Sequence, residues 1–439
     1  MGRVIFTGAN LVDGDHPARP NATVVIEGER ITSVSDAPPA DVGAADRVMA
    51  LDGKTLMPGM VSCHFHSCFH NLQPGGAPSL GLEHTPAVLT LLAAQNLELA
   101  LHCGVTSVVG SSVPYHIDAS LRDAMSVGLI PGPRMLAGSH ELSTTGDMID
   151  YGNQLWHYEL GNLGVVRVTD GPDGFRQLVR EEIARGSDVV KVNGSRGHGS
   201  GPTDGRCSLR RDEFQAIAET AHERGAKVRV HAASQRSILE AAKAGFDVID
   251  HADRMDAECI DAILAAGSSV TPSLFYSQRL LEMYDRFDPK APDCPMRSPL
   301  ETPAQAEARV EGIRREFDFT LRAMQDAHIA GVNLVTGDDF GTFLLQHGEY
   351  AAELEVFVKL LGVPPLDVIR WATRNGARLM GRGAELGTIE PGKLADVLVV
   401  DGDPLADIRC LQDTDKIEVI LKGGFFVKNE LVGAHETRG

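Results

Sequence analysis

The 439-residue sequence lacks paired cysteines, and this absence bears on the compartment in which the protein works. Its seven cysteines are odd in number and none of them forms a Cys-x-x-Cys pair. A disulfide framework needs matched cysteines, and a structural zinc ribbon needs close pairs. We therefore expect no disulfide framework and a reducing, cytoplasmic environment.

Long apolar runs and an excess of basic residues are also missing. No apolar stretch approaches the about 18 residues that a membrane-spanning helix needs, and the first residues do not resemble a signal peptide. The formal net charge of -19 disfavours binding to nucleic acid or to an anionic membrane. We expect a small-molecule substrate, no nucleic-acid or membrane partner, and a homo-oligomer, for which the sequence offers no specific pattern.

A Gly-x-Gly-x-x-Gly motif is absent after the first strand of the central region, which disfavours a doubly wound nucleotide-binding sheet. This region instead alternates short β-branched strands with helical stretches. Eight strands that alternate with helices are typical of the α/β class and of a (β/α)8 TIM barrel, predicted here for residues 58–384. The candidate strands are 60–66, 105–109, 134–138, 188–193, 227–231, 247–251, 268–272 and 332–337.

The two ends of the chain, residues 1–57 and 385–439, contain short strands separated by turn residues such as Glu27-Gly28 and Asp401-Gly402. Isolated hairpins are marginally stable in water. We therefore predict that both ends pair into one small β-sandwich domain, with the barrel inserted between its halves.

The first predicted barrel strand ends in two histidines, His64 and His66. Residues i and i+2 of a strand point to the same face, so these imidazoles converge if the segment is extended. Converging imidazoles are good ligands for a divalent metal. For this pair alone, two satisfied core histidines are an equally good interpretation.

Four further predicted strands carry a possible metal ligand near the carboxyl end, where barrel enzymes hold their active sites. These residues are Lys191, His231, His251 and Asp338. Lys191 lies between valines, where an ammonium group is costly. It either reaches a buried carboxylate or loses its proton and reacts with carbon dioxide to form a carbamate, and the residues alone leave both interpretations open.

With these residues the sequence resembles the amidohydrolase superfamily, in the branch of imidazolonepropionase-like proteins and metal-dependent Xaa-Pro dipeptidases. The resemblance covers nearly the whole chain. It is carried by the His64-x-His66 pair after Met57-Pro58-Gly59, by Lys191, His231, His251 and Asp338, and by Pro391-Gly392-Lys393-Leu394-Ala395-Asp396 near the end.

The resemblance implies a centre of two divalent metal ions, with zinc as the expected metal. His64, His66 and Asp338 would bind one ion, and His231 and His251 would bind the other. Lys191, as N6-carboxylysine, would bridge the two. A metal-bound hydroxide would attack an amide-like C–N bond of an N-acyl amino acid, dipeptide, carbamate or urea, with Asp338 as the proton shuttle.

Three alternatives accompany this reading. A deaminase of the same superfamily usually has an acid soon after the strand-five histidine and no bridging lysine, whereas Ala232-Ala233-Ser234 follow His231 here. A cyclic-amide hydrolase would use the same centre. A non-catalytic barrel homologue would typically have lost ligands, and all six are present.

The remaining site predictions are weaker. Asp339 is expected to face away from the site if the chain is extended there. His140 is expected to be catalytic, donating to the substrate carbonyl after strand three. Predicted substrate-binding residues are His198, in a glycine-rich loop suited to a lid, Tyr115 and Tyr276. The segment Thr144–Gly152 stands where the branch commonly has Gly-Gly-His-Gly-Asp, which leaves the substrate open.

Overall fold

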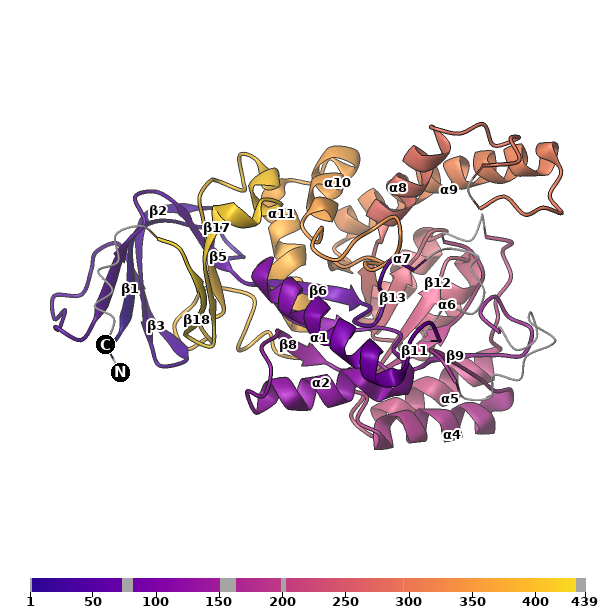
Figure 1. Cartoon of the computed structure of the whole chain (residues 1–439), viewed down its shortest axis with the longest axis horizontal. Coiled ribbons are helices and arrows are strands. Elements are labelled where there is room, and N and C mark those ends of the chain that lie inside the picture. Colours follow the sequence, from indigo (N-terminus) through magenta and orange to yellow (C-terminus); the bar gives the residue numbers. More distant parts are fainter. Residues whose placement is uncertain (1, 73–81, 151–162, 199–202, 295, 432–439) are drawn as a thin grey trace. The chain divides into compact units, whose positions relative to one another are not determined.

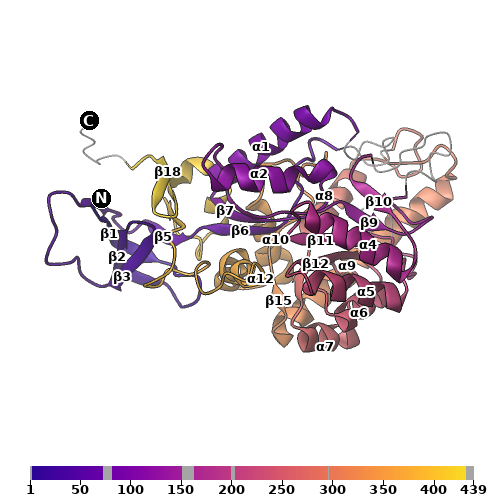
Figure 2. The same ribbon diagram turned by 90° about the horizontal axis from the view of Figure 1, so that it is seen from below.

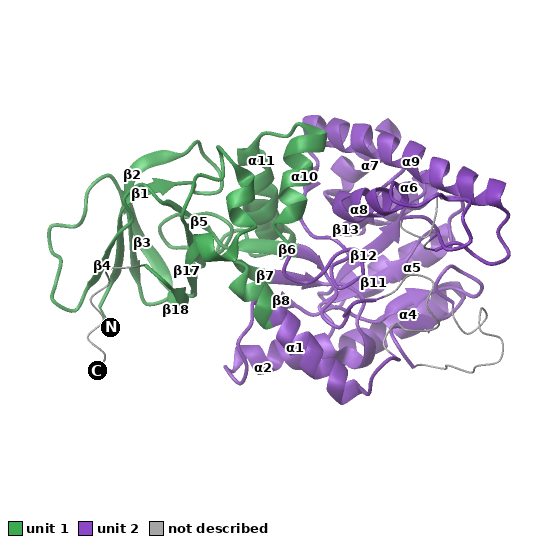
Figure 3. Cartoon of the chain, turned by 45° about the horizontal axis from the view of Figure 1, so that its top comes forward, with its two compact units in different colours: residues 1–62, 98–107, 350–439 green, residues 63–97, 108–349 purple. Residues whose placement is uncertain are grey.

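The structure is a computed structural model and describes residues 2–72, 82–150, 163–198, 203–294 and 296–431. The chain divides into two compact units (Figure 3). Unit 1 comprises residues 1–62, 98–107 and 350–439, and unit 2 comprises residues 63–97 and 108–349. Among the described residues, no helix is both long and apolar enough to cross a membrane.

Unit 1 contains an eight-stranded sheet that combines strands from both ends of the chain (Figure 1). The strand order is β18-β17-β16-β5-β1-β2-β3, and β4 pairs with β1. The antiparallel pairing of β5 with β16 joins the two ends, with Leu56 opposite Val399. The strands are β1 Val4–Leu11, β2 Arg19–Glu27, β3 Arg30–Ser35, β4 Arg47–Ala50, β5 Thr55–Pro58, β16 Val397–Val400, β17 Ile417–Lys422 and β18 Phe425–Asn429.

Unit 1 also contains helices that lie before the predicted domain boundary at residue 384. They are α10 Ala352–Leu361, α11 Pro365–Arg370, the π-helical turn η2 Trp371–Asn375 and α12 Gly376–Leu379. Gln412 Nε2 donates to Glu355 Oε2 over 2.8 Å, which ties α10 to the C-terminal segment, and the rings of Phe357 and Trp371 lie 5.3 Å apart. These contacts group the four helices with unit 1, and the predicted domain boundary at residue 384 stays a prediction.

Unit 2 contains a seven-stranded sheet in which every neighbouring pair is parallel. Its order is β10-β9-β11-β12-β13-β14-β15, and a second sheet has the order β6-β7-β8. The predicted α/β class is confirmed. The strands are β6 Met60–Phe65, β7 Val105–Gly110, β8 Arg134–Leu136, β9 Glu141–Ser143, β10 Val166–Val168, β11 Val189–Asn193, β12 Lys227–Ala232, β13 Val248–His251, β14 Ser269–Thr271 and β15 Asn333–Leu334.

Two sets of backbone hydrogen bonds link these sheets where a closed barrel would need them. Cys63 N donates to Thr336 O over 2.7 Å, which joins β6 to the residues after β15. Val189 N donates to Ala137 O over 3.0 Å, which joins β11 to the residues after β8. Complete closure into the predicted barrel stays a prediction, because the ladders are recorded as two separate sheets.

Helices connect the parallel strands, and α4 to α7 pack in sequence beside one another (Figure 2). Polar side chains cap the first turns of two of these helices. Ser234 accepts from Ser237 N at α6, and Asp256 accepts from Cys259 N at α7. The helices are α1 Pro86–His102, α2 Ile117–Ser126, α4 Gly171–Ala184, α5 Arg211–His222, α6 Gln235–Ala244, α7 Ala257–Ala266, α8 Leu274–Tyr284 and α9 Pro303–Ala330, with the short turn η1 Pro114–His116.

Candidate metal centre

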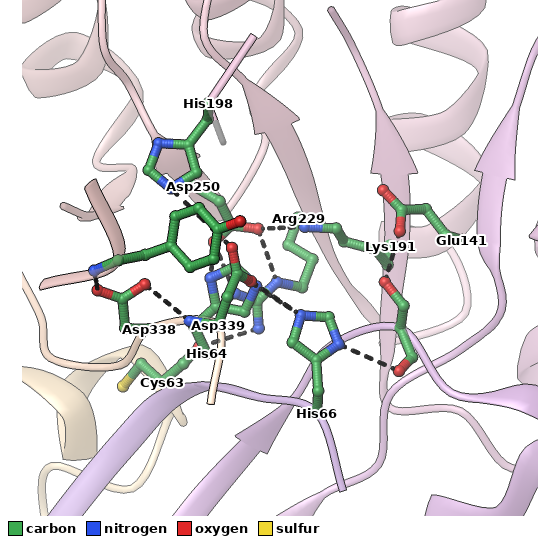
Figure 4. Close-up of polar contacts among 12 residues, drawn as sticks. Cys63, His64, His66, Glu141, Lys191, His198, Arg229, Asp250, Asp338 and Asp339 are labelled. Carbon is green, nitrogen blue, oxygen red and sulfur yellow. Dashed lines mark hydrogen bonds and ion pairs between the residues drawn. The ribbon is translucent and has the colours of Figure 1, made fainter. Parts of the chain in front are cut away.

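The end of β6 brings two buried imidazoles together (Figure 4). The Nε2 atoms of His64 and His66 lie 3.1 Å apart. The Nδ1 atom of His66 lies 3.3 Å from the carbonyl oxygen of Ser112, which favours the proton on Nδ1. The Nε2 lone pair of His66 is then directed at the point where the two rings converge, as the two-residue spacing predicts.

Asp339 completes this convergence, because its Oδ1 atom lies 3.3 Å from His64 Nε2 and 3.2 Å from His66 Nε2. The prediction that Asp339 faces away from the site is therefore wrong. Strand β15 already ends at Leu334, and Gly337 has a φ of 136°, so strand alternation does not extend to the aspartates. A Cβ atom at Gly337 would lie 2.3 Å from His64 N, so only glycine fits this approach.

Asp338, the predicted ligand, is directed elsewhere. Its Oδ2 accepts a hydrogen bond from Tyr276 N over 3.0 Å, and its Oδ1 accepts one from Asp339 N over 2.7 Å. Burial, together with the charge of Asp339, raises the pKa of Asp338 to about 7. Burial opposes ionisation of Asp339 too, but the facing imidazoles of His64 and His66 outweigh it and hold the pKa of Asp339 well below its usual range.

His251 reaches the same place by an unusual backbone. On β13 it follows Asp250, which faces His231 in the ladder, so simple alternation would turn His251 away. His251 and Ala252 instead have φ values of 69° and 50°, a left-handed conformation that is costly for non-glycine residues and often marks a functional site. The rings of His231 and His251 lie 4.5 Å apart, and those of His64 and His251 lie 5.3 Å apart.

These histidines fit a divalent cation. Burial lowers the pKa of His231 to about 3 and those of His64 and His251 well below the usual value, so the imidazoles are neutral. Within the described chain, His231 Nε2 and His251 Nδ1 have no hydrogen-bond partner. Buried polar atoms are seldom left unpaired without a reason, and neutral imidazoles with carboxylate oxygens form a ligand set suited to zinc.

Lys191 lies beneath this group and has the buried carboxylate partner that one sequence interpretation required. Its Nζ donates to Asp250 Oδ2 over 2.8 Å, and both side chains are buried. Arg229, also buried, binds the same carboxylate. The sequence pattern indicated neither Arg229 nor Asp250 as part of the site, although both lie on the strands that carry His231 and His251.

His198 lies against the histidine group, and its predicted role in substrate binding stays a prediction. Its ring stacks on His251 with centroids 3.8 Å apart and planes 17° apart, and its Nε2 lies 4.0 Å from Asp339 Oδ2. Asp253 holds the other face, with its Oδ1 3.2 Å from His198 Nδ1. Burial lowers the pKa of His198, but Asp253 outweighs it and raises the value to about 9. The rest of the predicted lid, residues 199–202, lies outside the described residues.

Tyr276 is also near this group. Its ring centroid lies 5.7 Å from that of His198, and its backbone N–H binds Asp338. Burial raises the pKa of the Tyr276 phenol, so the hydroxyl is protonated at neutral pH and available as a donor.

His140 belongs to a different cluster, which corrects its predicted catalytic role. Its Nδ1 lies 3.1 Å from both carboxylate oxygens of Glu182, and its Nε2 accepts from Tyr115 N over 3.2 Å. Both ring nitrogens are therefore occupied, so His140 cannot donate to a substrate carbonyl. Arg167 and His116 also contact Glu182, at 2.9 and 3.1 Å. The binding role predicted for Tyr115 stays a prediction.

Two further polar residues of the site were missed in the sequence, and only one of them, Asn193, follows from strand alternation. Glu141 lies beside Lys191 in the β9–β11 ladder, and its Oε2 accepts from Ser112 Oγ over 2.6 Å. Asn193 lies two residues after Lys191, beside His231. It is fully buried, and neither its amide nitrogen nor its amide oxygen has a partner in the described part of the chain. Its amide is free to bind a ligand.

Among known protein families, the model described as "Amidohydrolase family" matches residues 55–427 of this chain. The chain belongs to the amidohydrolase family. The resemblance seen in the sequence is thereby confirmed for most of its length.

The individual proteins that this amidohydrolase resembles have low sequence identity to it. It is 26% identical to an ochratoxinase of Aspergillus niger over 461 aligned residues, which cover 98% of this chain and 87% of the relative. It resembles a solved prolidase complexed with N-methylphosphonate-L-proline, with a TM-score of 0.78, 27% identity and coverage of 97% of this chain and 100% of that one. A Xaa-Pro dipeptidase structure with bound methionine has a TM-score of 0.83 and covers 98% of this chain and 100% of its own, but at 24% identity it supports the fold only.

Proposed function

We propose that this amidohydrolase is a metal-dependent hydrolase of an amide-like C–N bond. The observation that carries the proposal is that His64 and His66 converge on Asp339 while the rings of His231 and His251 lie beside them, with all four imidazoles buried. The family match and the similarity to an ochratoxinase and a prolidase support an enzyme of this class. The substrate range stays that of the sequence prediction: an N-acyl amino acid, dipeptide, carbamate or urea.

Two divalent ions, zinc being the best suited, would be held by this chain's own residues. His64, His66 and Asp339 would hold one ion, with Asp339 in the place first given to Asp338. His231 and His251 would hold the other, and Lys191, as N6-carboxylysine, would bridge the pair. Such ions lower the pKa of a water molecule and polarise a carbonyl group.

The remaining chemistry falls to side chains around these ligands. Asp339 is the proposed proton shuttle, because it is the ionised carboxylate at the convergence point. Asp338 fixes the backbone of Asp339 and Tyr276 through two hydrogen bonds. His198, whose Nδ1 is held by Asp253 and whose Nε2 is unpartnered in the described residues, would face the substrate, as would Tyr276.

We also propose that the barrel is closed. We infer that β6 to β8 and β11 to β15 form one closed (β/α)8 barrel, spanning residues 58–384, and that residues 1–57 and 385–439 form the small β domain. The inter-sheet hydrogen bonds at Cys63 and Val189 support closure.

The test is turnover measured together with metal content. Purified protein is stripped with a chelator, reloaded with zinc and assayed against N-acyl amino acids, dipeptides, N-aryl carbamates and N-aryl ureas. We expect hydrolysis of at least one class to be lost with the metal and regained with it, near two ions per chain. Equal turnover by stripped and loaded protein, or a fully loaded protein that hydrolyses no member of the four classes, would contradict the proposal.

A further inference from the structure

We propose that Asp250, clamped by Arg229, is a positioning residue that sets the direction of a carbamate on Lys191. The inference rests on the proposed function, since it concerns how the bridging group is held. It assigns a purpose to a buried ion cluster, formed by Arg229, Asp250 and Lys191, that contacts no substrate.

The clamp begins with a fully buried arginine. Arg229 Nη2 lies 2.6 Å from Asp250 Oδ1, and its Nε donates to Asp250 Oδ2 over 3.1 Å, a two-pronged geometry that fixes the carboxylate plane. Its Nη1 donates to the carbonyl oxygens of Cys63 over 2.9 Å and Gly110 over 3.0 Å. The guanidinium is therefore held by the ends of β6 and β7 and cannot swing away from Asp250 (Figure 4).

The lysine shares this carboxylate with one of the proposed metal ligands. Lys191 and Arg229 are neighbours in the β11–β12 ladder, and Lys191 Nζ donates to Asp250 Oδ2 over 2.8 Å. The Nδ1 atom of His64 lies 3.8 Å from the other carboxylate oxygen, Asp250 Oδ1. The lysine nitrogen thus lies on the same carboxylate as His64 while one of its N–H bonds is directed at Asp250.

The chemistry of carbamate formation keeps that hydrogen bond. The neutral amine of Lys191 attacks the carbon of carbon dioxide, an N–C bond forms, and one C=O electron pair moves onto oxygen. The nitrogen gives one proton to solvent and keeps one N–H. Because the carbamate nitrogen is planar, the direction of its carboxylate is set once the lysine stem and the N–H donated to Asp250 are both fixed.

The charges are consistent with this role. A carbamate beside an isolated carboxylate would be disfavoured by like-charge repulsion in a buried site. Arg229 cancels the charge of Asp250, so the added negative charge of the carbamate faces the proposed cations alone. An aspartate without the arginine would oppose the modification, and an arginine without the aspartate would leave the lysine nitrogen without its acceptor.

The experiment removes the two clamp residues together. In the double variant Arg229→Met/Asp250→Leu both partners become apolar, a change that is often tolerated for buried ion pairs. The single variant Asp250→Asn keeps the side-chain shape. Asp247→Asn is the matched aspartate-to-asparagine control, because Asp247 directly precedes the same strand and pairs with His222 and Lys227. Circular dichroism and thermal unfolding establish which variants are folded.

The readouts are the carbamate carbon signal in 13C NMR after exposure to 13C-labelled bicarbonate, and zinc affinity with metal counted per chain. For wild type and Asp247→Asn we expect the signal and two ions. For the clamp variants we expect a weaker carbamate signal and about 10- to 100-fold weaker zinc binding, as for other groups that orient ligands.

A folded clamp variant with unchanged carbamate signal and unchanged zinc affinity would overturn the inference. Should the double variant not fold, Asp250→Asn decides by the same criteria. A wild-type protein without the signal would instead overturn the proposed carbamate bridge, which separates the two failures.

Discussion

Adjacent aspartates acquire opposite properties at the end of β15. Asp338 accepts two backbone N–H bonds, while Asp339 faces His64 and His66. Burial raises the pKa of Asp338 to about 7, and the imidazoles keep Asp339 ionised despite burial. Environment rather than residue type therefore assigns the chemical role to Asp339.

Substitution of the two aspartates by asparagine tests this assignment. We expect Asp339→Asn to lower kcat/KM by about 10²- to 10⁴-fold, the usual contribution of a proton-transfer group, and to weaken metal binding. Asp338→Asn should retain its metal and lose less than about tenfold, because asparagine resembles the protonated acid and still accepts a backbone hydrogen bond. Steady-state kinetics and metal analysis measure both. A larger loss in Asp338→Asn would return the role to Asp338.

The orientation of single side chains was predicted correctly where residues alternate along an extended strand. It was predicted wrongly where the extended conformation ends. The spacing of His64 and His66 placed both imidazoles correctly, because β6 is extended through Phe65. Asp339 lies two residues after Gly337, whose positive φ departs from the extended conformation, so strand alternation could not indicate its orientation. The place of Asn193 in the site could have been predicted from strand alternation, because Lys191 and Asn193 lie on the same face of β11.

At the scale of elements, Glu182 connects α4 to the turn after β7 and to the segment after β8. His140, His116 and Arg167 all contact its carboxylate, and the turn they hold contains Tyr115 and His116 with φ values of 57° and 55°. Burial raises the pKa of Glu182, but its donors outweigh burial and keep the pKa below the usual value of 4.5. This cluster therefore stabilises the fold instead of acting on substrate.

The lowered pKa makes the contribution of Glu182 dependent on pH. Since the folded state holds the carboxylate ionised more strongly than the unfolded state, its stabilisation is complete above about pH 4.5 and falls as the pH drops further. We expect Glu182→Gln to lose about 3 kcal/mol of unfolding free energy at pH 7, as for other broken buried ion clusters. In urea unfolding, the gap between wild type and variant should narrow below pH 4.5. A gap that is constant from pH 7 to pH 4 would contradict this account.

The prediction of strands from the sequence was limited by the shortness of some strands. All eight predicted barrel strands have counterparts, whereas β9 and β10 were not predicted because each has three residues and is too short to show a period. His251 needed a left-handed turn that a residue other than glycine seldom adopts, so its position was predicted only through the family resemblance.

At the scale of the whole chain, the sheet of unit 1 needs both ends of the polymer. Its core includes Leu56 from β5 and Val397 and Val399 from β16, all fully buried. The composition of each end, short β-branched strands without a helix to cover them, allowed this pairing to be predicted. The helices between residues 350 and 379 were instead predicted as part of the barrel, because strand and helix patterns do not reveal which core a helix joins.

A core substitution tests the shared sheet. We expect Leu56→Ala to lower the unfolding free energy by about 2–5 kcal/mol, because it removes buried methyl groups that cannot be replaced by neighbours. Val48→Ala in β4, at a side chain that is 49% exposed, is the matched control and should change stability by less than about 0.5 kcal/mol. Denaturant unfolding measures both values. Similar losses in the two variants would argue against a common core made by both ends.

The central claim, a two-metal site built from six side chains, is tested most directly by anomalous diffraction at the zinc edge from crystals of the zinc-loaded protein. The account predicts two peaks. One should lie about 2.0–2.2 Å from the Nε2 atoms of His64 and His66 and from the carboxylate of Asp339, and the other should be bound by His231 and His251. A map without peaks among these residues, or with Asp338 in place of Asp339 as the ligand, would contradict it.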